Sequence, residues 1–264
     1  MRSATAAYQF ARIVVCFIAA TTMLAFDDHA TAADCQFDMF GEGRVGSIAD
    51  ARTVRLEDGR DIRLDGIEVA NVDTTSAADV STLTRLLLGR VVTLRGENDA
   101  PDRYGRQRAW VFRDGESVSV QTLLLAEGAA LASGSVADAD CAAGLLAAEA
   151  TARSARRGVW AGRAVIKNAE SPGDILARIG RFTVVEGKVL SARQAGAMFY
   201  VNFGRRWTRD FAVTIPRRAM ASIERAGIPL KSLENRRIRV RGWIQQRGGP
   251  RIEVSRPGQI GLAE

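Results

Sequence analysis

The chain of 264 residues is poor in histidine, cysteine and proline, with one, three and six of them. Its single histidine, His29, lies in a segment with the pattern of a secretory signal peptide. Arg2 and Arg12 precede an apolar run at residues 13–26, and small residues follow at 30–33. Cleavage after residue 33 leaves a mature chain without histidine, which excludes Ser-His-Asp and Cys-His catalysis and histidine-ligated metal sites. Any hydrolysis must then use carboxylates, arginines and a hard cation.

Long hydrophobic runs are also scarce. The apolar run at 13–26 has 14 residues, short for a membrane span, so an uncleaved anchor is the alternative to a removed signal. We expect no membrane span after cleavage. Cleavage also removes Cys16 and leaves Cys35 and Cys141, and an oxidising compartment favours one disulfide between them over two buried thiols. The sequence therefore predicts a periplasmic or secreted protein.

Acidic residues are depleted towards the C-terminus. Residues 175–264 carry 18 lysines and arginines against 6 acidic residues, a net charge of +12. Residues 34–174 carry 17 against 22, a net charge of −5. A basic part beside an acidic one indicates that the basic part meets a polyanion, if the protein binds one.

Hydrophobic periodicity and turn residues predict two folded parts, residues 34–162 and 181–264, joined by a linker at 163–180. In the first part we expect strands at 43–56, 61–67, 91–95 and 109–112 and helices at 77–88, 118–132 and 142–157, the second of these with a break near Gly128. In the second we expect strands at 182–192, 198–203, 210–215, 236–245 and 251–255 and a helix at 216–226. The predicted fold class is α+β, mainly β: a barrel with three helices, then a small five-stranded barrel of the oligonucleotide-binding (OB) type.

Three motifs mark the first part. One is Thr53-Val54-Arg55-Leu56 followed by Ile62-Arg63-Leu64-Asp65-Gly66-Ile67-Glu68. Another is Asp102-Arg103-Tyr104-Gly105-Arg106. The third is Ala148-Glu149-Ala150-Thr151-Ala152-Arg153, which ends at Gly158-Val159-Trp160. Their order and spacing resemble the thermonuclease (staphylococcal nuclease-like) family, whose segments read D-G-D-T, R-L-x-G-I-D-A-P-E, D-K/R-Y-G-R and A-E-x-x-A-R/K with G-I/V/L-W.

The resemblance covers residues 43–160 and implies calcium-dependent phosphodiester hydrolysis. In the family, carboxylates hold the hard cation, a glutamate activates water and two arginines neutralise the phosphoryl charge. The two arginines fall on Arg63 and Arg106. Carboxylates that would hold the metal fall on Asp50 and on Glu68, the latter one methylene longer than the family's aspartate.

Two family positions have lost their acid. The second carboxylate of D-G-D-T falls on Arg52, and the general base falls on Asn71, whose amide cannot take a proton from water. Asp65 or Asp73 could substitute after a loop shift. We prefer the hypothesis that Arg52 pairs with Glu68 and turns the metal site into a structural ion pair.

The retained residues also have structural interpretations. Arg63 and Arg106 could pair with carboxylates in place of phosphate, and Tyr104 with Gly105 could serve only a turn. We expect Trp160 to close the core and to contact no ligand.

The second part places basic residues among aromatics and is similar to OB-fold nucleic-acid-binding domains. Alternation on the strand at 236–245 puts Arg237, Arg239 and Arg241 on one face, which could simply be solvated. Anionic lipid, an anionic polymer or the protein's own acidic first part could also attract it. The predicted nucleic-acid contacts are Arg103, Tyr104, Tyr200, Arg205, Arg206, Trp207, Arg237, Arg239, Arg241 and Trp243.

Three functions remain open. The first is a binding protein for single-stranded nucleic acid or another polyanion, with a degenerate catalytic site and no cofactor. The second is an active nuclease with a rearranged site, which would need Ca²⁺. The third is an envelope module that binds a protein partner.

Overall fold

In the computed structural model the described residues are 35, 37–70, 77–162 and 165–263. The expected signal peptide, Asn71 and Asp73 lie outside them. No described helix is long and apolar enough to cross a membrane. All of the described residues belong to a single compact unit.

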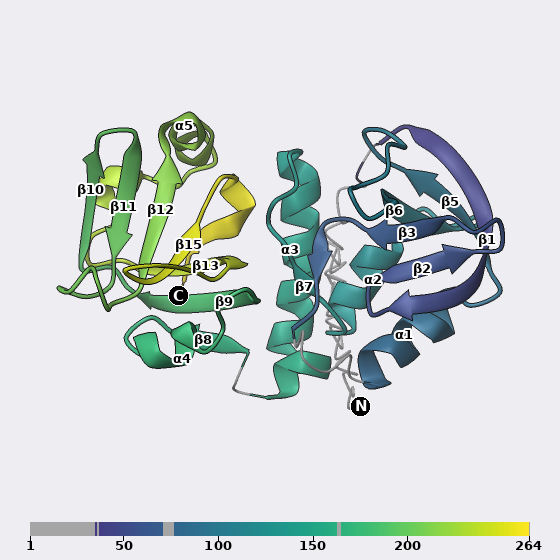
Figure 1. Ribbon diagram of the computed structural model, residues 1–264, viewed down its shortest axis with the longest axis horizontal. Helices are drawn as coiled ribbons and strands as arrows, with labels where there is room; N and C mark the ends of the chain where they lie inside the picture. The colour runs from purple at the N-terminus through teal and green to yellow at the C-terminus, as the bar shows by residue number, and fades with distance from the viewer. Residues whose placement is uncertain (1–34, 36, 71–76, 163–164, 264) are drawn as a thin grey trace, which may run out of the picture. The chain divides into compact units, whose positions relative to one another are not determined.

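Five strands close into a barrel in the order β1-β2-β3-β6-β5 (Figure 1). Their bounds are β1 Met39–Asp50, β2 Thr53–Leu56, β3 Asp61–Leu64, β5 Val91–Arg95 and β6 Arg106–Arg113. Alternate residues such as Ile62, Leu64, Val92 and Leu94 point inward and are buried. A turn at residues 51–52 divides the strand expected at 43–56 into β1 and β2, so position 52 lies at the end of the barrel.

The helices of this part match the expected order. They are α1 Ala77–Leu87, α2 Val120–Ala126 and α3 Ala139–Ser154, followed by the short helix η1 Gly158–Ala161. The break expected near Gly128 is confirmed: α2 ends before it, and the chain turns at Gly128 with φ +71°. The residues after the break form no helix but β7 Leu131–Ala132, which pairs with β4 Ile67–Glu68. A Cβ on Gly128 would lie 2.3 Å from the Arg157 carbonyl oxygen, so only glycine allows this approach.

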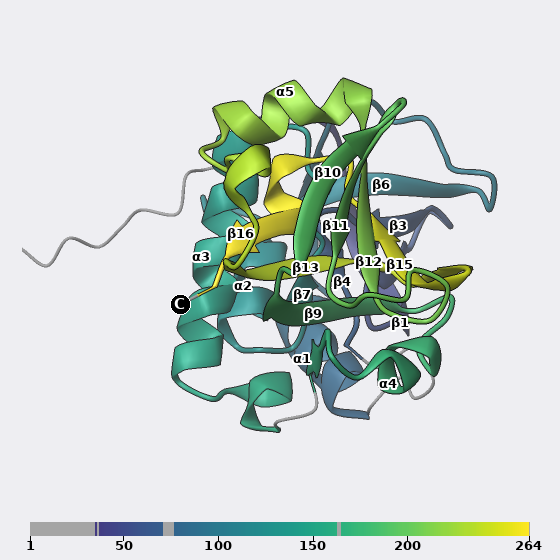
Figure 2. The same ribbon diagram turned by 90° about the vertical axis from the view of Figure 1, so that its left-hand side faces the viewer.

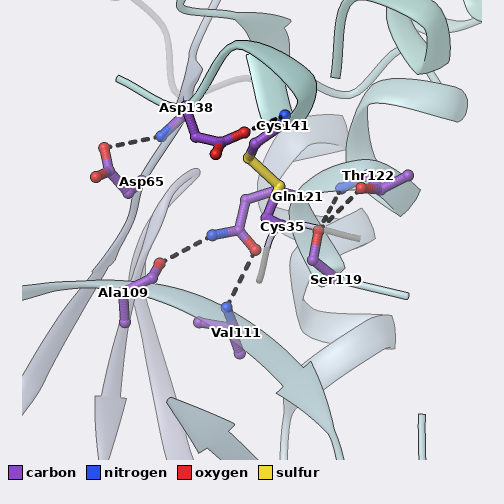
Figure 3. The surroundings of a disulfide bond; sticks show 10 residues. Cys35, Asp65, Ala109, Val111, Ser119, Gln121, Thr122, Asp138 and Cys141 are labelled. Atoms are coloured by element: carbon purple, nitrogen blue, oxygen red, sulfur yellow. Dashed lines mark hydrogen bonds between the residues drawn. A yellow bond between two sulfur atoms is a disulfide. The ribbon is translucent and has the colours of Figure 1, made fainter. Parts of the chain in front are cut away.

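The predicted disulfide is confirmed. Cys35 and Cys141 are bonded, with a Cα–Cα distance of 4.7 Å and a sequence separation of 106 (Figure 3). It ties the segment before β1 to the first turn of α3, whose N-cap Asp138 accepts a hydrogen bond from the Cys141 N–H at 2.7 Å. Nearby, the buried Gln121 side chain bridges the backbone of β6 at both of its amide ends (Figure 3).

The second part contains more strands than expected. Its elements are β8 Ile166–Asn168, α4 Pro172–Leu176, β9 Phe182–Lys188, β10 Ser191–Ala195, β11 Met198–Asn202, β12 Ala212–Pro216, α5 Arg217–Arg225, η2 Leu230–Ser232, β13 Arg237–Trp243, β14 Gln245–Arg247, β15 Gly249–Glu253, η3 Pro257–Gln259 and β16 Ile260–Leu262. They form a sheet in the order β10-β11-β12-β15-β14 and another in the order β16-β13-β9-β8 (Figure 2). The five expected strands are all present, with 182–192 divided into β9 and β10 and 236–245 into β13 and β14, while β8 and β16 are added at the edges of one sheet. A further β domain therefore follows the first.

The expected linker at 163–180 contains a strand and a short helix. β8 pairs in parallel with β9, and α4 begins at Pro172, where proline suits the first helical turn. Pro172, one of the turn residues that indicated a linker, begins the helix α4. The strand β8, which precedes it, is added at the edge of a sheet. One apolar cluster fills the barrel and another lies in the second part, which agrees with two folded parts, while their boundaries stay a prediction.

Candidate functional site

The turn after β1 brings Arg52 against β4. The Arg52 guanidinium forms an ion pair with Glu68 and donates to the Ile67 carbonyl oxygen at 3.2 Å. These two charged side chains are only 11% and 13% exposed. The Asp50 carboxylate accepts the Arg52 backbone N–H at 2.8 Å and so holds the turn. The ion pair predicted from the sequence is confirmed.

The carboxylates near this ion pair already have partners within the protein. Burial raises the pKa of the Glu68 carboxyl, and the Arg52 charge only partly opposes that rise. Asp65, the possible substitute ligand, forms an ion pair with Arg108 and accepts the Gly66 N–H at 2.8 Å. Burial alone would lower the pKa of Arg108, but Asp65 outweighs it and the pKa is raised. Each carboxylate here therefore has a cationic or backbone partner.

β3 and β6 carry the two retained arginines. They pair in parallel, with Asp61 opposite Arg106 and Arg63 opposite Arg108, and Ile62 between the two β3 positions faces the core. Arg63 forms no ion pair with any residue that the structure describes. Arg106 instead pairs with Asp102 at 2.8 Å. Of the two arginines, only Arg106 has an ion-pair partner among the residues that the structure describes.

The D-R-Y-G-R segment forms a turn around Asp102. Its carboxylate accepts the backbone N–H groups of Tyr104 at 2.8 Å and Arg106 at 3.1 Å. The side-chain hydrogen bonds from Arg106 lower the pKa of Asp102 to about 2. Tyr104 is 65% exposed, with the guanidinium carbons of Arg103 and Arg106 at 4.7 and 5.0 Å from its ring centroid. The motif thus builds a turn and also presents an aromatic ring to solvent.

The third motif lies on α3 and ends at a buried tryptophan. Glu149 is fully buried and accepts the Ala132 N–H at 2.9 Å. Trp160 packs in an apolar cluster with Leu131, Ala152, Phe182 and Val184. The expected core role of Trp160 is confirmed.

These motifs agree with a comparison against protein families, in which residues 75–162 match the staphylococcal nuclease homologue model. Residues 75–162 are a staphylococcal nuclease-like domain. The match contains Arg106 and α3, and it begins after Arg52, Arg63 and Glu68. No curated protein matches the chain.

The described residues of the nuclease-like part do not fit calcium at the family's metal position. A guanidinium contacts Glu68 there, which puts a positive charge where the cation would bind. Within residues 35, 37–70, 77–162 and 165–263, no three His, Cys, Asp or Glu side chains gather as a metal site would need. We therefore derive no catalytic step through a metal.

The arginine row of β13 is mostly paired. Arg237 and Arg239 both bind Glu186, at 2.8 and 2.7 Å. Burial alone would raise the pKa of Glu186, but the hydrogen bonds from these arginines outweigh it and lower the pKa. Arg241 is only 4% exposed and pairs with Glu149 at 2.8 Å. The prediction that Arg241 lies on an open binding face is wrong, because this part of the strand is covered by α3 of the nuclease-like domain.

Trp243, at the end of β13, is 41% exposed and packs edge-on against Phe182, with the ring centroids 6.2 Å apart. Tyr200 lies half-buried on β11, with the Arg251 guanidinium carbon 6.0 Å from its ring centroid. These two predicted aromatics therefore belong to different sheets.

The loop between β11 and β12 is where arginines and an aromatic meet solvent. Arg205, Arg206, Trp207 and Arg209 are exposed, Trp207 to 69%. Asp210 fixes the loop by accepting the Arg206 backbone N–H at 2.7 Å. The Asp210 side chain thus orders the backbone, while the basic side chains project outward.

The β14–β15 hairpin adds Arg247 to this surface. A Cβ on Gly248 would lie 3.5 Å from the Trp207 ring, and one on Gly249 would lie 2.5 Å from the Asp210 carbonyl oxygen. We call Arg205, Arg206, Trp207, Arg209 and Arg247 the Trp207 patch. Among the described residues, no ion pair involves its four arginines.

Sequence reasoning missed several of these residues. Arg209 and Arg247 were not among the predicted contacts, and neither was Glu149 as the partner of Arg241. The G-G-P turn after Arg247 signals a hairpin, but no local pattern indicates which loop that hairpin touches.

Proposed function

We propose that this nuclease-family protein binds single-stranded nucleic acid through the Trp207 patch and does not hydrolyse it at the inherited site. The observation that carries the proposal is an exposed tryptophan among four unpaired arginines. Single strands bind by stacking bases on aromatic rings while cationic side chains follow the backbone. The patch offers both features on one surface.

The proposal that the inherited site does not hydrolyse nucleic acid is supported by the ion pair of Arg52 with Glu68. A guanidinium bonded to that carboxylate competes with a divalent cation for the same oxygens. The family's general-base position holds Asn71, and loss of a general base alone lowers rates by about 10²–10⁴-fold. Arg63 and Arg106 support the alternative of a rearranged nuclease, so cleavage must be measured together with binding.

The test uses purified residues 34–264 and a fluorescent single-stranded oligonucleotide, as DNA and as RNA. We expect salt-sensitive binding without cleavage, in calcium and in chelator alike. Each phosphate contact contributes about 0.7 to the slope of log affinity against log salt. Trp207→Ala should weaken binding about 5- to 150-fold, the equivalent of 1–3 kcal/mol of base stacking.

The matched control is Trp243→Ala, which removes an exposed tryptophan from the other sheet. Equal losses in the two variants would contradict the assignment to the Trp207 patch. Calcium-dependent cleavage would refute the proposal that the inherited site is inactive and would favour the rearranged nuclease. Absence of both binding and cleavage would favour an envelope protein partner.

We also propose that the protein is exported to the periplasm or beyond. The signal-peptide pattern at residues 1–33 and the Cys35–Cys141 disulfide support this, because disulfides persist in oxidising compartments. Intact mass of the protein recovered from cell fractions tests it. A cytoplasmic chain that retains residues 1–33 would refute export.

A further inference from the structure

A small cavity lies where α3 meets β13 and the C-terminal strand β16. It has a volume of about 170 Å³, and its lining includes Arg153, Arg239, Arg241 and Glu149. One water needs roughly 10–15 Å³ of such volume, so the cavity has room for a polyatomic ion. Leu262 in its lining is 45% exposed. The cavity is therefore open to solvent at that side.

The charges around this cavity do not balance. Arg241 is neutralised by Glu149, and Arg239 shares Glu186 with Arg237. The Arg153 side chain forms no ion pair or hydrogen bond with any described residue, and its nearest aromatic contact is the Trp160 ring, 5.8 Å from its guanidinium carbon. One half-buried guanidinium thus has no ion-pair partner in the described part of the chain.

The energetics of Arg153 agree with an uncompensated charge. Burial lowers the pKa of its guanidinium, the positive charges of Arg239 and Arg241 lower it further, and the charges of Glu149 and Glu186 oppose this shift only in part. An anion in the cavity would relieve that repulsion and accept charge-assisted hydrogen bonds from Arg153. A planar guanidinium with five donors suits the paired oxygens of a phosphoryl group.

We propose that this cavity binds a phosphoryl dianion, with Arg153 as its principal ligand. The site is separate from the Trp207 patch and from the inherited nuclease site. Gly258 and Gly261 also line it and contribute no side chain, which leaves room beside the arginines. Free phosphate and the terminal phosphate of a nucleic acid share the required chemistry.

The experiment titrates residues 34–264 with inorganic phosphate at constant ionic strength and follows ³¹P line width. We expect saturable binding in the wild type and in Arg218→Gln, which removes an exposed arginine of α5. Arg153→Gln should weaken binding at least about tenfold, through loss of charge-assisted hydrogen bonds. Equal phosphate affinity in Arg153→Gln and Arg218→Gln would overturn the site, as would the absence of saturable binding in the wild type.

Two further arms complete the test. Arg153→Lys keeps the charge and the fold, and it should retain binding more strongly than Arg153→Gln; binding as weak as in Arg153→Gln would count against a phosphate ligand role. A 5′-phosphorylated dinucleotide that binds more tightly than inorganic phosphate identifies a nucleic-acid end as the source, whereas equal affinity identifies free phosphate. Inorganic phosphate has no base to stack on Trp207, so this site can be tested even if the proposed function fails.

Discussion

Arg241 should contribute more to stability than any other arginine of β13. Its guanidinium is 4% exposed, donates to the Ala132 carbonyl oxygen at 2.8 Å and neutralises the fully buried Glu149. Arg241→Met leaves that carboxylate buried without its cation. Breaking a buried pair by removing one partner destabilises proteins by about 3–5 kcal/mol. Since whole proteins are stable by about 5–15 kcal/mol, the variant should lose a large fraction of its stability.

The measurement is urea denaturation followed by far-UV circular dichroism. Arg237→Met is the matched control, because Arg237 is 54% exposed and its partner Glu186 keeps Arg239. An exposed pair contributes about 0–1 kcal/mol. Adding Glu149→Gln to Arg241→Met removes the orphan charge and should recover part of the loss. The reasoning is refuted if Arg241→Met loses no more stability than Arg237→Met.

Three further predictions concern the nuclease-like part. Replacing Cys35 and Cys141 with serine should lower the free energy of unfolding by about 2–4 kcal/mol, and reductant should then have no further effect on the urea midpoint. Gln121→Leu removes the side-chain acceptor of the buried Val111 N–H, whereas the Ala109 carbonyl oxygen keeps the Asp65 N–H, and it should cost about 1–3 kcal/mol, again by denaturation. Because Asp102 has a pKa of about 2, below its unfolded value, its contribution is present above about pH 4 and is lost as the pH falls through 2. The stability difference between wild type and Asp102→Asn should therefore shrink between about pH 4 and pH 2; a difference independent of pH would contradict the pairing with Arg106.

Local motifs predicted contacts in the first part well, because the contacting residues occupy fixed positions in the motifs that resemble the family. Arg52 and Glu68 could be placed opposite each other because both positions align with carboxylates that share one cation. The disulfide followed from counting, since the predicted signal cleavage would leave only Cys35 and Cys141. In both cases the information lies in residue identity at a fixed place in the chain.

The second β domain could not be predicted to the same depth. Alternation on β13 shows which residues share a face, but it does not show what covers that face. Arg241 and its partner Glu149 are 92 residues apart, and their meeting depends on how α3 packs against the sheet. Arg247 lies near the Trp207 loop because the β14–β15 hairpin packs against that loop. Such contacts are tertiary and leave no signal in local periodicity.

Net charge is therefore an incomplete guide to where a polyanion would bind. Residues 175–264 carry a charge of +12, yet Arg241 is used to neutralise a carboxylate of the nuclease-like domain, and Arg237 and Arg239 share Glu186. Arg52 serves Glu68 in the same way. Among the described cations without an ion pair are Arg63, Arg218, Arg153 and the arginines of the Trp207 patch, and the two proposed sites use the last two of these. Only the patch has an exposed aromatic ring among them, and this separates a surface for single strands from a cavity for one phosphoryl group.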